Sequence, residues 1–155
     1  MHEHDLLKLE NQLCHRFYSV SNAFTRAYRP LLKSLDITYP QYLVMMALWE
    51  QDNVTISQLV EKCRVDAGAL TLILQKLAQK AFIVIKPSQH DKRVKEVALT
   101  EKGQTTKSEA LQIPKQLLCQ LQNLDAGEMQ QLKVLIDKLY CELATPQDRV
   151  AANDS

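Results

Sequence analysis

The sequence is poor in residues that interrupt helices, with three glycines and five prolines among 155 residues. Aromatic residues are also scarce, at 6% of the chain, whereas leucine, glutamine, lysine and alanine are frequent. Glycine and proline break helices, whereas leucine, glutamine, lysine and alanine favour them. The composition therefore predicts a mainly helical fold, and no internal repeat or low-complexity tract interrupts it.

Long apolar runs are absent as well. No run approaches the roughly 20 apolar residues that a membrane-spanning helix needs. The polar N-terminus, Met1–Asp5, lacks the apolar segment of a signal peptide. We therefore expect a cytoplasmic protein without a membrane partner, in a compartment where thiols are normally reduced.

Motifs that bind metals or catalyse reactions are also missing. The four cysteines have no C-x-x-C spacing, and the four histidines are scattered; the cysteines are Cys14, Cys63, Cys119 and Cys141. This pattern argues against a zinc site. The sequence contains neither a Gly-rich phosphate loop nor a Ser-His-Asp arrangement. We expect no metal, no cofactor and no enzymatic turnover.

Charge is distributed unevenly along the chain. The net charge is only +1, yet the segment from Lys62 to Lys95 carries eight basic and two acidic residues. The remainder of the chain is therefore net acidic. A basic middle between acidic ends points to one surface for a polyanion such as DNA. The alternative from charge alone is an ordinary solvated charge run.

The first half of the chain shows helical periodicity. Apolar residues recur at helical spacing over 5–35, which predicts one long amphipathic helix, or one with a break near Pro30. Thr38 and Gln41 form a capping-box pattern that predicts a second helix to about Gln51. The residues expected to be buried in this second helix are Leu43, Met46, Ala47 and Leu48 or Trp49.

The middle of the chain predicts a winged helix-turn-helix. Thr55 with Gln58 opens a short helix that ends near Cys63, and Asp66 caps another that extends through Lys80. The β-branched run 83–85, the polar run 87–93 and the apolar run 97–99 then predict a two-stranded hairpin with a basic tip.

The last third predicts two more helices. One begins at Thr100, bends at Pro114 and ends near Asn123. The other is capped by 124–128 and carries an apolar stripe: Met129, Leu132, Leu135, Ile136, Leu139 and Leu143. The terminal helices have more apolar surface than the central unit can cover, which favours a two-fold dimer. We therefore expect a single chain over 1–145, with dimerisation helices at 5–35 and 101–145, a winged helix-turn-helix at 38–100 and a flexible tail at 146–155.

The second helix of a helix-turn-helix enters the major groove. Here that helix starts at Asp66, and its candidate DNA-binding residues are Asp66, Ala67, Ala69, Thr71, Gln75 and Lys76. Gln75 is suited to adenine, Thr71 to a phosphate or a base, and the alanines to thymine methyl groups.

The basic tip of the hairpin adds a second candidate DNA contact. Lys92 and Arg93 are suited to a narrow minor groove. Asp91 is two residues from Arg93 and is placed to hold its guanidinium.

Two runs resemble a known family. The run 91–103, DKRVKEVALTEKG, resembles the wing signature of MarR-family transcriptional regulators. The run 35–44, LDITYPQYLV, followed by 48–50, LWE, resembles the branch of organic-hydroperoxide sensors called OhrR. The similarity covers about residues 13–143. It implies a dimeric repressor that binds a pseudo-palindromic operator, with Arg93 in the minor groove.

One departure from the branch concerns the recognition helix. The branch usually begins this helix with Asp-Ser-Gly-Thr, whereas this sequence has Asp-Ala-Gly-Ala at 66–69. Two hydroxyl groups expected to touch DNA are therefore absent. The operator sequence cannot be transferred from the branch.

Cys14 is the candidate sensor. A thiol reacts with peroxide as the thiolate, which nearby donors stabilise. We expect Cys14 inside the first helix, far from its N-terminus, with Tyr18 one turn away. Tyr28 lies too far along the same helix, so only a partner's antiparallel helix can bring a tyrosine at this position to Cys14. The alternative is that Cys14 and both tyrosines are packing residues.

The resemblance assigns the same roles. It implies a reactive Cys14 held by tyrosines at the positions of Tyr18 and Tyr28 from the opposite subunit. Some members of the branch carry a second cysteine that captures the oxidised first one, and Cys119 lies in the matching helix. The alternative is an ordinary helix cysteine, as we expect for Cys63 and Cys141.

Together with these observations, the resemblance implies a repressor that binds operator DNA when reduced and releases it when organic hydroperoxide oxidises Cys14. Three alternatives remain. A MarR-type repressor would be released by a small aromatic acid under reducing conditions. A thiol peroxidase would turn over peroxide, with Arg16 or Arg26 as weak candidates for activating the thiol. A helical adaptor without a nucleic-acid partner would leave the basic wing unexplained.

Overall fold

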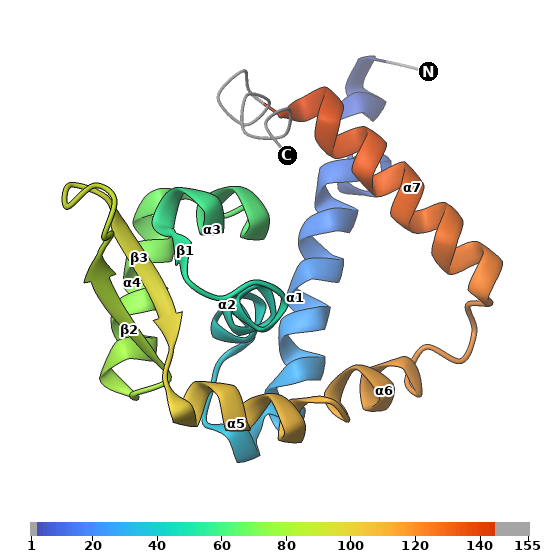
Figure 1. Cartoon of the computed structure of the whole chain (residues 1–155). Helices are drawn as coiled ribbons and strands as arrows, with labels where there is room; N and C mark the ends of the chain where they lie inside the picture. The colour runs from blue at the N-terminus through green and yellow to red at the C-terminus, as the bar shows by residue number, and fades with distance from the viewer. Residues whose placement is uncertain (1–2, 145–155) are drawn as a thin grey trace.

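A computed structural model describes residues 3–144, so the expected tail at 146–155 lies outside the described residues. The fold is mainly helical with a small antiparallel wing, as the sequence predicts (Figure 1). Three short 3-10 helices accompany the main elements, at Glu3–Leu7, Leu9–Asn11 and Lys33–Leu35. The helices and strands are α1 Leu13–Leu32, α2 Tyr39–Glu50, β1 Val54–Thr55, α3 Ile56–Cys63, α4 Ala67–Gln79, β2 Ile83–Pro87, β3 Lys95–Leu99, α5 Glu101–Ala110, α6 Ile113–Leu118 and α7 Ala126–Leu143. Within residues 3–144, no helix is both long and apolar enough to span a membrane.

The first helix begins later than the periodicity predicts. It starts at Leu13 instead of Asp5, and the preceding residues form two short 3-10 turns. The side-chain amides of Asn11 and Gln12 donate hydrogen bonds to the backbone carbonyls of Asp5 and Leu6. Such local side-chain-to-backbone bonds compete with helix formation. Pro30 lies inside α1 without ending it.

Capping boxes set the starts of α2 and α3 where the sequence predicts them. The Thr38 backbone N–H donates to the Gln41 side chain at 3.0 Å. Thr55 and Gln58 exchange two bonds, of 2.8 and 3.1 Å. Residues 64–66 then form the three-residue turn between α3 and α4, and Arg64 adopts a left-handed conformation with φ 51°. The helix-turn-helix is therefore confirmed.

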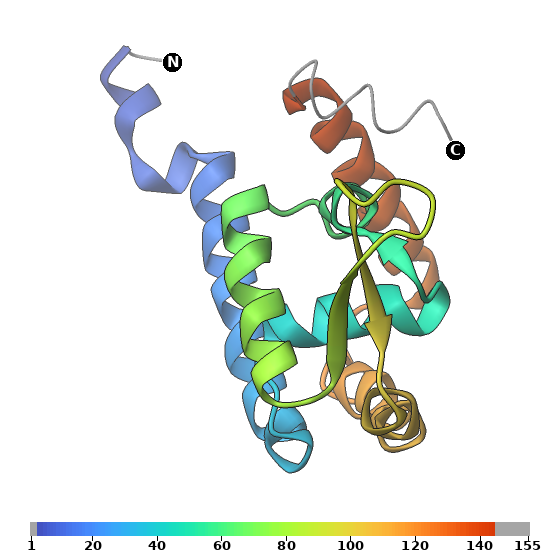
Figure 2. The same ribbon diagram turned by 60° about the vertical axis from the view of Figure 1, so that its left-hand side comes forward.

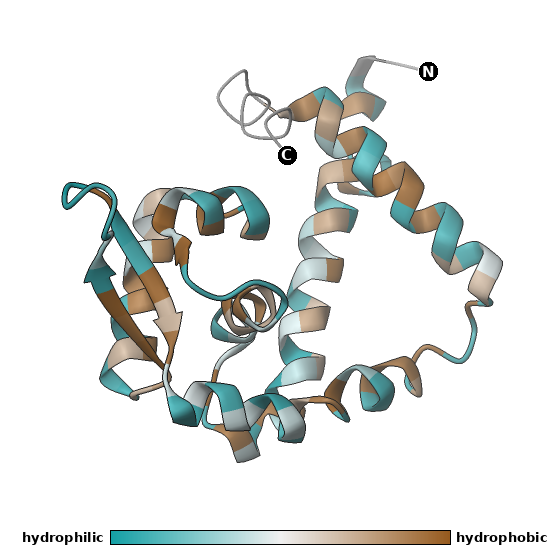
Figure 3. Ribbon diagram, in the orientation of Figure 1, coloured by the Kyte–Doolittle hydropathy of each residue, from teal (hydrophilic) through white to brown (hydrophobic). Residues whose placement is uncertain are grey.

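The wing is a three-stranded sheet in the order β1-β3-β2. The hairpin pairs Ile83 with Leu99, and the two-residue β1 pairs Val54 with Val97. The sequence did not predict β1, because so short a strand exists only through its pairing with a segment more than forty residues away. The hairpin ends in a loop at the opposite end of β3 from α5 (Figures 1 and 2), and this loop is hydrophilic (Figure 3).

The predicted bent helix over 100–123 is two helices. α5 ends at Ala110, and α6 begins at Ile113 with Pro114 in its first turn. Proline lacks an N–H, so it is tolerated in a first turn but disrupts a helix interior. The chain therefore starts a new helix instead of bending, and α6 ends at Leu118 instead of Asn123. The capping box of Asp125 and Glu128 then opens α7 as predicted.

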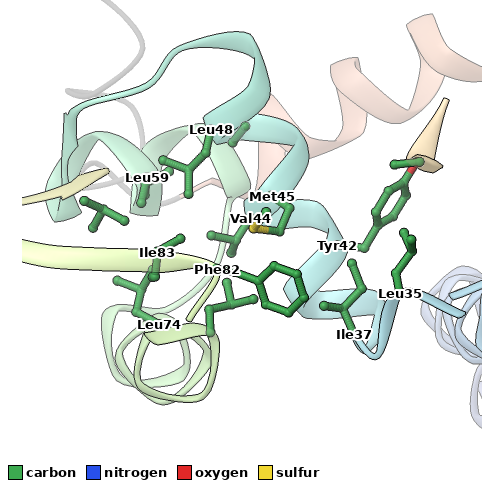
Figure 4. Close-up of a cluster of buried hydrophobic side chains, with 14 of the residues drawn as sticks. Leu35, Ile37, Tyr42, Val44, Met45, Leu48, Leu59, Leu74, Phe82 and Ile83 are labelled. Carbon is green, nitrogen blue, oxygen red and sulfur yellow. The ribbon is translucent and has the colours of Figure 1, made fainter. Parts of the chain in front are cut away.

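The core lies around α2, between α1, the helix-turn-helix and the sheet (Figure 4). α2 is buried on more than one face, because α1, α3, α4 and α5 all pack against it. Leu43 and Met46, expected to be buried, are only half-buried. Ala47 and Leu48 are buried as expected. The fully buried side chains of α2 also include Tyr42, Val44 and Met45, with Leu59, Leu74, Phe82 and Ile83 packed around them.

Gly103 joins α5 to this core. The Trp49 indole N–H donates to the Gly103 carbonyl at 2.9 Å. A Cβ at position 103 would overlap the Phe82 carbonyl oxygen and lie 3.1 Å from a Leu99 methyl carbon. This close approach requires glycine, and it fixes the end of the wing against the rest of the fold.

Candidate DNA-binding face and redox site

The second helix of the helix-turn-helix, α4, has one buried and one exposed face. Leu70, Leu74 and Leu77 face the core. The residues predicted from the sequence to contact DNA are all exposed: Asp66, Ala67, Ala69, Thr71, Gln75 and Lys76. The fold therefore presents them together on a single helical surface.

Local hydrogen bonding shapes what this face offers to DNA. Thr71 donates its hydroxyl hydrogen to the Ala67 carbonyl at 2.9 Å. In this conformation Thr71 accepts hydrogen bonds, which suits a base amino group and not a phosphate oxygen. The Asp66 carboxylate makes no capping bond to α4. Leu72 is also exposed here, at 61% of its surface, although an apolar residue would be assigned to the core from its type alone.

The tip of the wing holds a pre-oriented arginine. Arg93 donates from Nε to one Asp91 oxygen at 3.1 Å and from a terminal nitrogen to the other at 3.2 Å. The Arg93 backbone N–H also donates to Asp91, at 3.0 Å. These bonds lower the pKa of the Asp91 carboxyl. The Arg93 side chain remains 91% exposed, and Lys92 beside it is exposed too.

Cys14 lies in the first turn of α1, and not deep inside a longer helix as the sequence suggested. The difference follows from the late start of α1. The first turn of a helix carries backbone N–H groups without helical partners, and these favour a negative charge. Cys14 is exposed, and Tyr18, one turn away, is 69% exposed.

Tyr28 belongs to an aromatic cluster far from Cys14 of the same chain. Its ring stacks on Tyr39 with centroids 4.6 Å apart, and the Tyr42 ring lies at 5.6 Å. Burial raises the pKa of Tyr28 from 10.0 to about 12, with added contributions from Tyr39 and Tyr42. Tyr28 thus keeps its hydroxyl hydrogen, and remains a hydrogen-bond donor, across the physiological pH range.

The raised pKa of Tyr28 predicts an alkaline transition. Because the unfolded state loses this proton near pH 10 and the folded state near 12, the free energy of unfolding falls as pH rises between these values. Phenolate absorbance should include a component with a midpoint near pH 12, which Tyr28→Phe removes. If Tyr28→Phe showed the same absorbance change near pH 12 as the wild type, the assignment of this transition to Tyr28 would be contradicted.

The other cysteines differ in their surroundings. Cys119 is exposed and comes directly after the last residue of α6, so it lies outside that helix. α6 contacts α1, at the end of α1 opposite to its first turn (Figures 1 and 2). A 20-residue helix is about 30 Å long, whereas disulfide Cα atoms lie within about 7 Å. Cys14 and Cys119 of one chain are therefore too far apart to pair. Cys141 is exposed, and burial raises the pKa of the half-buried Cys63 thiol.

Apolar side chains remain uncovered at both ends of the chain. No residue of α7 is buried, and Leu135 and Leu143 are 63% and 74% exposed. Leu13 and Val20 of α1 are 55% and 53% exposed. Apolar residues recur along α7 in Figure 3. Such extended apolar surface marks a site of association.

Arg64 connects the helix-turn-helix to α7. It lies in the turn after α3, and its guanidinium is 3.2 Å from an Asp137 oxygen and 4.0 Å from the centre of the Tyr140 ring. Both partners belong to α7. These contacts join α7 to the turn that precedes α4.

A groove of about 730 Å³ lies where α1, the following turn, α2 and the end of α4 meet. Its lining includes Arg29, Lys33, Tyr39, Pro40 and Lys80. The size is within the usual range for small-molecule sites. Among residues 3–144, no group of three His, Cys, Asp or Glu side chains is placed to hold a metal ion.

The chain is similar to known transcriptional regulators. A family profile described as transcriptional regulator SarA/Rot matches residues 26–110. The organic hydroperoxide resistance transcriptional regulator of Bacillus subtilis (strain 168) is 40% identical over 141 residues, covering 91% of this chain and 93% of the relative.

Solved structures agree with these matches. Reduced AbfR bound to DNA superposes with a TM-score of 0.76 at 28% identity, covering 92% of this chain and 96% of AbfR. Overoxidized AbfR bound to DNA gives 0.74 at 28% identity, covering 92% and 100%. A cysteine-to-serine mutant of MarR from E. coli, complexed with operator DNA, gives 0.75 at 29% identity, covering 82% and 92%.

Proposed function

Because this chain belongs to the MarR/SarA family of DNA-binding transcriptional regulators, which are not enzymes, we propose that it is a redox-sensing repressor. A reduced homodimer binds pseudo-palindromic operator DNA, and oxidation of Cys14 by an organic hydroperoxide releases it. The observation that carries the proposal is the position of Cys14: an exposed thiol in the first turn of a helix whose apolar residues are left uncovered.

The exposed face of α4 and the wing tip supply the DNA contacts. The recognition helices of a dimer enter successive major grooves about 34 Å apart. Gln75 is suited to a base edge, and Lys76 to a phosphate. The Arg93 guanidinium enters the minor groove already oriented by Asp91, so little side-chain freedom is lost on binding.

The exposed apolar surfaces of α1 and α7 form the dimer interface. Burial of an exposed leucine contributes about 1.5–3 kcal/mol, and several such residues are available on each chain. In an antiparallel arrangement of two α1 helices, the first turn of one helix faces the C-terminal half of the other. Tyr28 of one protomer then donates its hydroxyl hydrogen to the Cys14 sulfur of its partner.

The redox step balances with the hydroperoxide as oxidant. The Cys14 thiolate attacks the O–O bond; an S–O bond forms, the O–O bond breaks, and the alkoxide leaves and is protonated to the alcohol. The partner's Cys119 thiolate then attacks the sulfenic sulfur. An S–S bond forms, the S–O bond breaks, and the hydroxide leaves as water.

Release follows from the geometry of this disulfide. Cys14 lies in the first turn of α1 and Cys119 follows α6, so the bond draws together segments at opposite ends of two different protomers. The terminal helices move, and the Arg64 contacts transmit the movement from α7 to the helix-turn-helix. Each 1.4 kcal/mol of mismatch at the operator weakens binding tenfold. Overoxidized AbfR has been solved bound to DNA, which supports the disulfide, and not further oxidation, as the releasing event.

The test is mass spectrometry of non-reduced protein after one equivalent of cumene hydroperoxide. We expect a covalent dimer whose cross-linked peptides join Cys14 to Cys119. Cys119→Ser should give no covalent dimer and should carry extra oxygen on Cys14, whereas Cys141→Ser should behave as the wild type. A cross-link that excludes Cys14, or unmodified thiols throughout, would contradict the proposal.

The groove beside Arg29 and Lys33 supports a second candidate function, release by a small aromatic acid. Its cations are suited to a carboxylate, and Tyr39 and Pro40 to an aromatic ring. This mechanism predicts release by salicylate with all thiols reduced, and unchanged release in Cys14→Ser. The redox mechanism predicts neither.

A further inference from the structure

The exposed face of α4 has an apolar centre. Gly68, Leu72, Gln75 and Gln79 are spaced by four, three and four residues, so they share one face of the helix. All four are exposed. Leu72 is 61% exposed in the middle of this row, whereas the neighbouring Leu70 and Leu74 are fully buried. Leu72 is therefore not part of the core that its neighbours build.

Gly68 supplies an independent observation on the same face. A Cβ at position 68 would meet no atom within 4 Å, whereas one at Gly103 would clash with backbone. The fold therefore does not require glycine at 68, although glycine in a helix costs about 0.5–1 kcal/mol relative to alanine. Absence of a side chain permits close approach of a surface from outside the chain. Gly68 lies one turn before Leu72.

The rest of this face offers few hydrogen-bond donors at its N-terminal end. Ala67 and Ala69 have none in their side chains, and the Thr71 hydroxyl hydrogen is engaged by the Ala67 carbonyl. Only thymine presents an apolar group, its C5-methyl, at the major-groove edge of a base pair. An exposed leucine between such neighbours matches that methyl group and no other base feature.

We propose that Leu72 contacts a thymine methyl group in each operator half-site, and that Gly68 lets the helix approach the DNA closely enough for this contact. The inference rests on the proposed function and specifies what part of the operator this chain recognises. Specificity at this base pair comes from apolar contact. An arginine or glutamine there would instead read the pair by hydrogen bonds.

The experiment uses a duplex selected by the full-length reduced protein from a random-sequence pool. Each thymine is replaced in turn by deoxyuridine, which removes only the methyl group. Wild-type protein should lose about fourfold in affinity per contacted methyl, since burying one methyl-sized group is worth that factor. Leu72→Ala should lose this sensitivity at the same position and keep it elsewhere. Val84→Ala, which truncates another exposed apolar residue, serves as the control and should match the wild type.

Gly68→Ala separates stability from binding. It should raise the thermal midpoint of the free protein, because alanine favours the helix, and weaken binding to the selected duplex at least about threefold. The inference is overturned if no methyl group matters to the wild type, if Leu72→Ala keeps the same sensitivity, or if Gly68→Ala binds as well as the wild type. Failure to select any duplex would overturn the proposed function itself, and this inference with it.

Discussion

Cys14→Ser should remain on the operator when an alkyl hydroperoxide is added. Under the same treatment the wild type should lose on the order of 100-fold in affinity, which corresponds to about 3 kcal/mol of misalignment. The serine hydroxyl has nearly the size of the thiol but is not oxidised by peroxide. Because Cys14 is exposed, the substitution removes no core packing. Fluorescence anisotropy of a labelled operator before and after cumene hydroperoxide measures the effect.

The matched control is Cys141→Ser. Cys141 is also exposed and also lies on a terminal helix, so general oxidation damage would affect both positions alike. We expect this variant to release DNA as the wild type does. Release of Cys14→Ser by hydroperoxide would remove Cys14 from the mechanism, whatever happened to the other thiols.

Gly103→Ala should destabilise the folded chain by roughly 3 kcal/mol, the upper end of the usual cost of overpacking. The added Cβ would meet the Phe82 carbonyl, which already accepts the Thr100 N–H at 3.0 Å and lies 3.1 Å from the Thr100 hydroxyl, whose shorter bond, of 2.6 Å, is to the Ala81 carbonyl. That carbonyl cannot move without breaking these bonds. α5 cannot retreat either, because Trp49 holds the Gly103 carbonyl.

Urea denaturation and thermal melting measure this effect. A loss of about 3 kcal/mol lowers the thermal midpoint by roughly 6–12 °C for a chain of this size. Gly68→Ala is the control, since its added Cβ meets nothing and should not destabilise the protein. An unchanged midpoint in Gly103→Ala would mean that the approach of α5 to the end of the wing is looser than described.

Local sequence patterns predicted those parts of the fold that depend on local bonds. The capping boxes at Thr55 and Asp125 join residues three apart, so the starts of α3 and α7 follow from the sequence. The pairing of Asp91 with Arg93, two residues apart, does too. The start of α1 was not predicted correctly. Apolar periodicity continues through residues 5–12, but side-chain amides there donate hydrogen bonds to the backbone and prevent the helix.

Other features that the sequence did not predict depend on contacts between distant segments. β1 forms only by pairing with β3, and Tyr28 stacks on Tyr39 across two helices. Arg64 reaches Asp137, 73 residues away. No prediction was made for Leu72, whose exposure appears only in the fold. The family resemblance was confirmed, whereas the roles of Cys14, Tyr18, Tyr28 and Cys119 stay predictions.

The most direct test of the redox switch is the dissociation constant for one selected operator, measured with fully reduced and fully disulfide-linked wild-type protein at the same salt concentration. Matched salt is essential because phosphate contacts make DNA affinity strongly salt-dependent. We expect the oxidised dimer to bind at least about 100-fold more weakly, and dithiothreitol to restore the original affinity. Equal dissociation constants for the two forms would contradict the account.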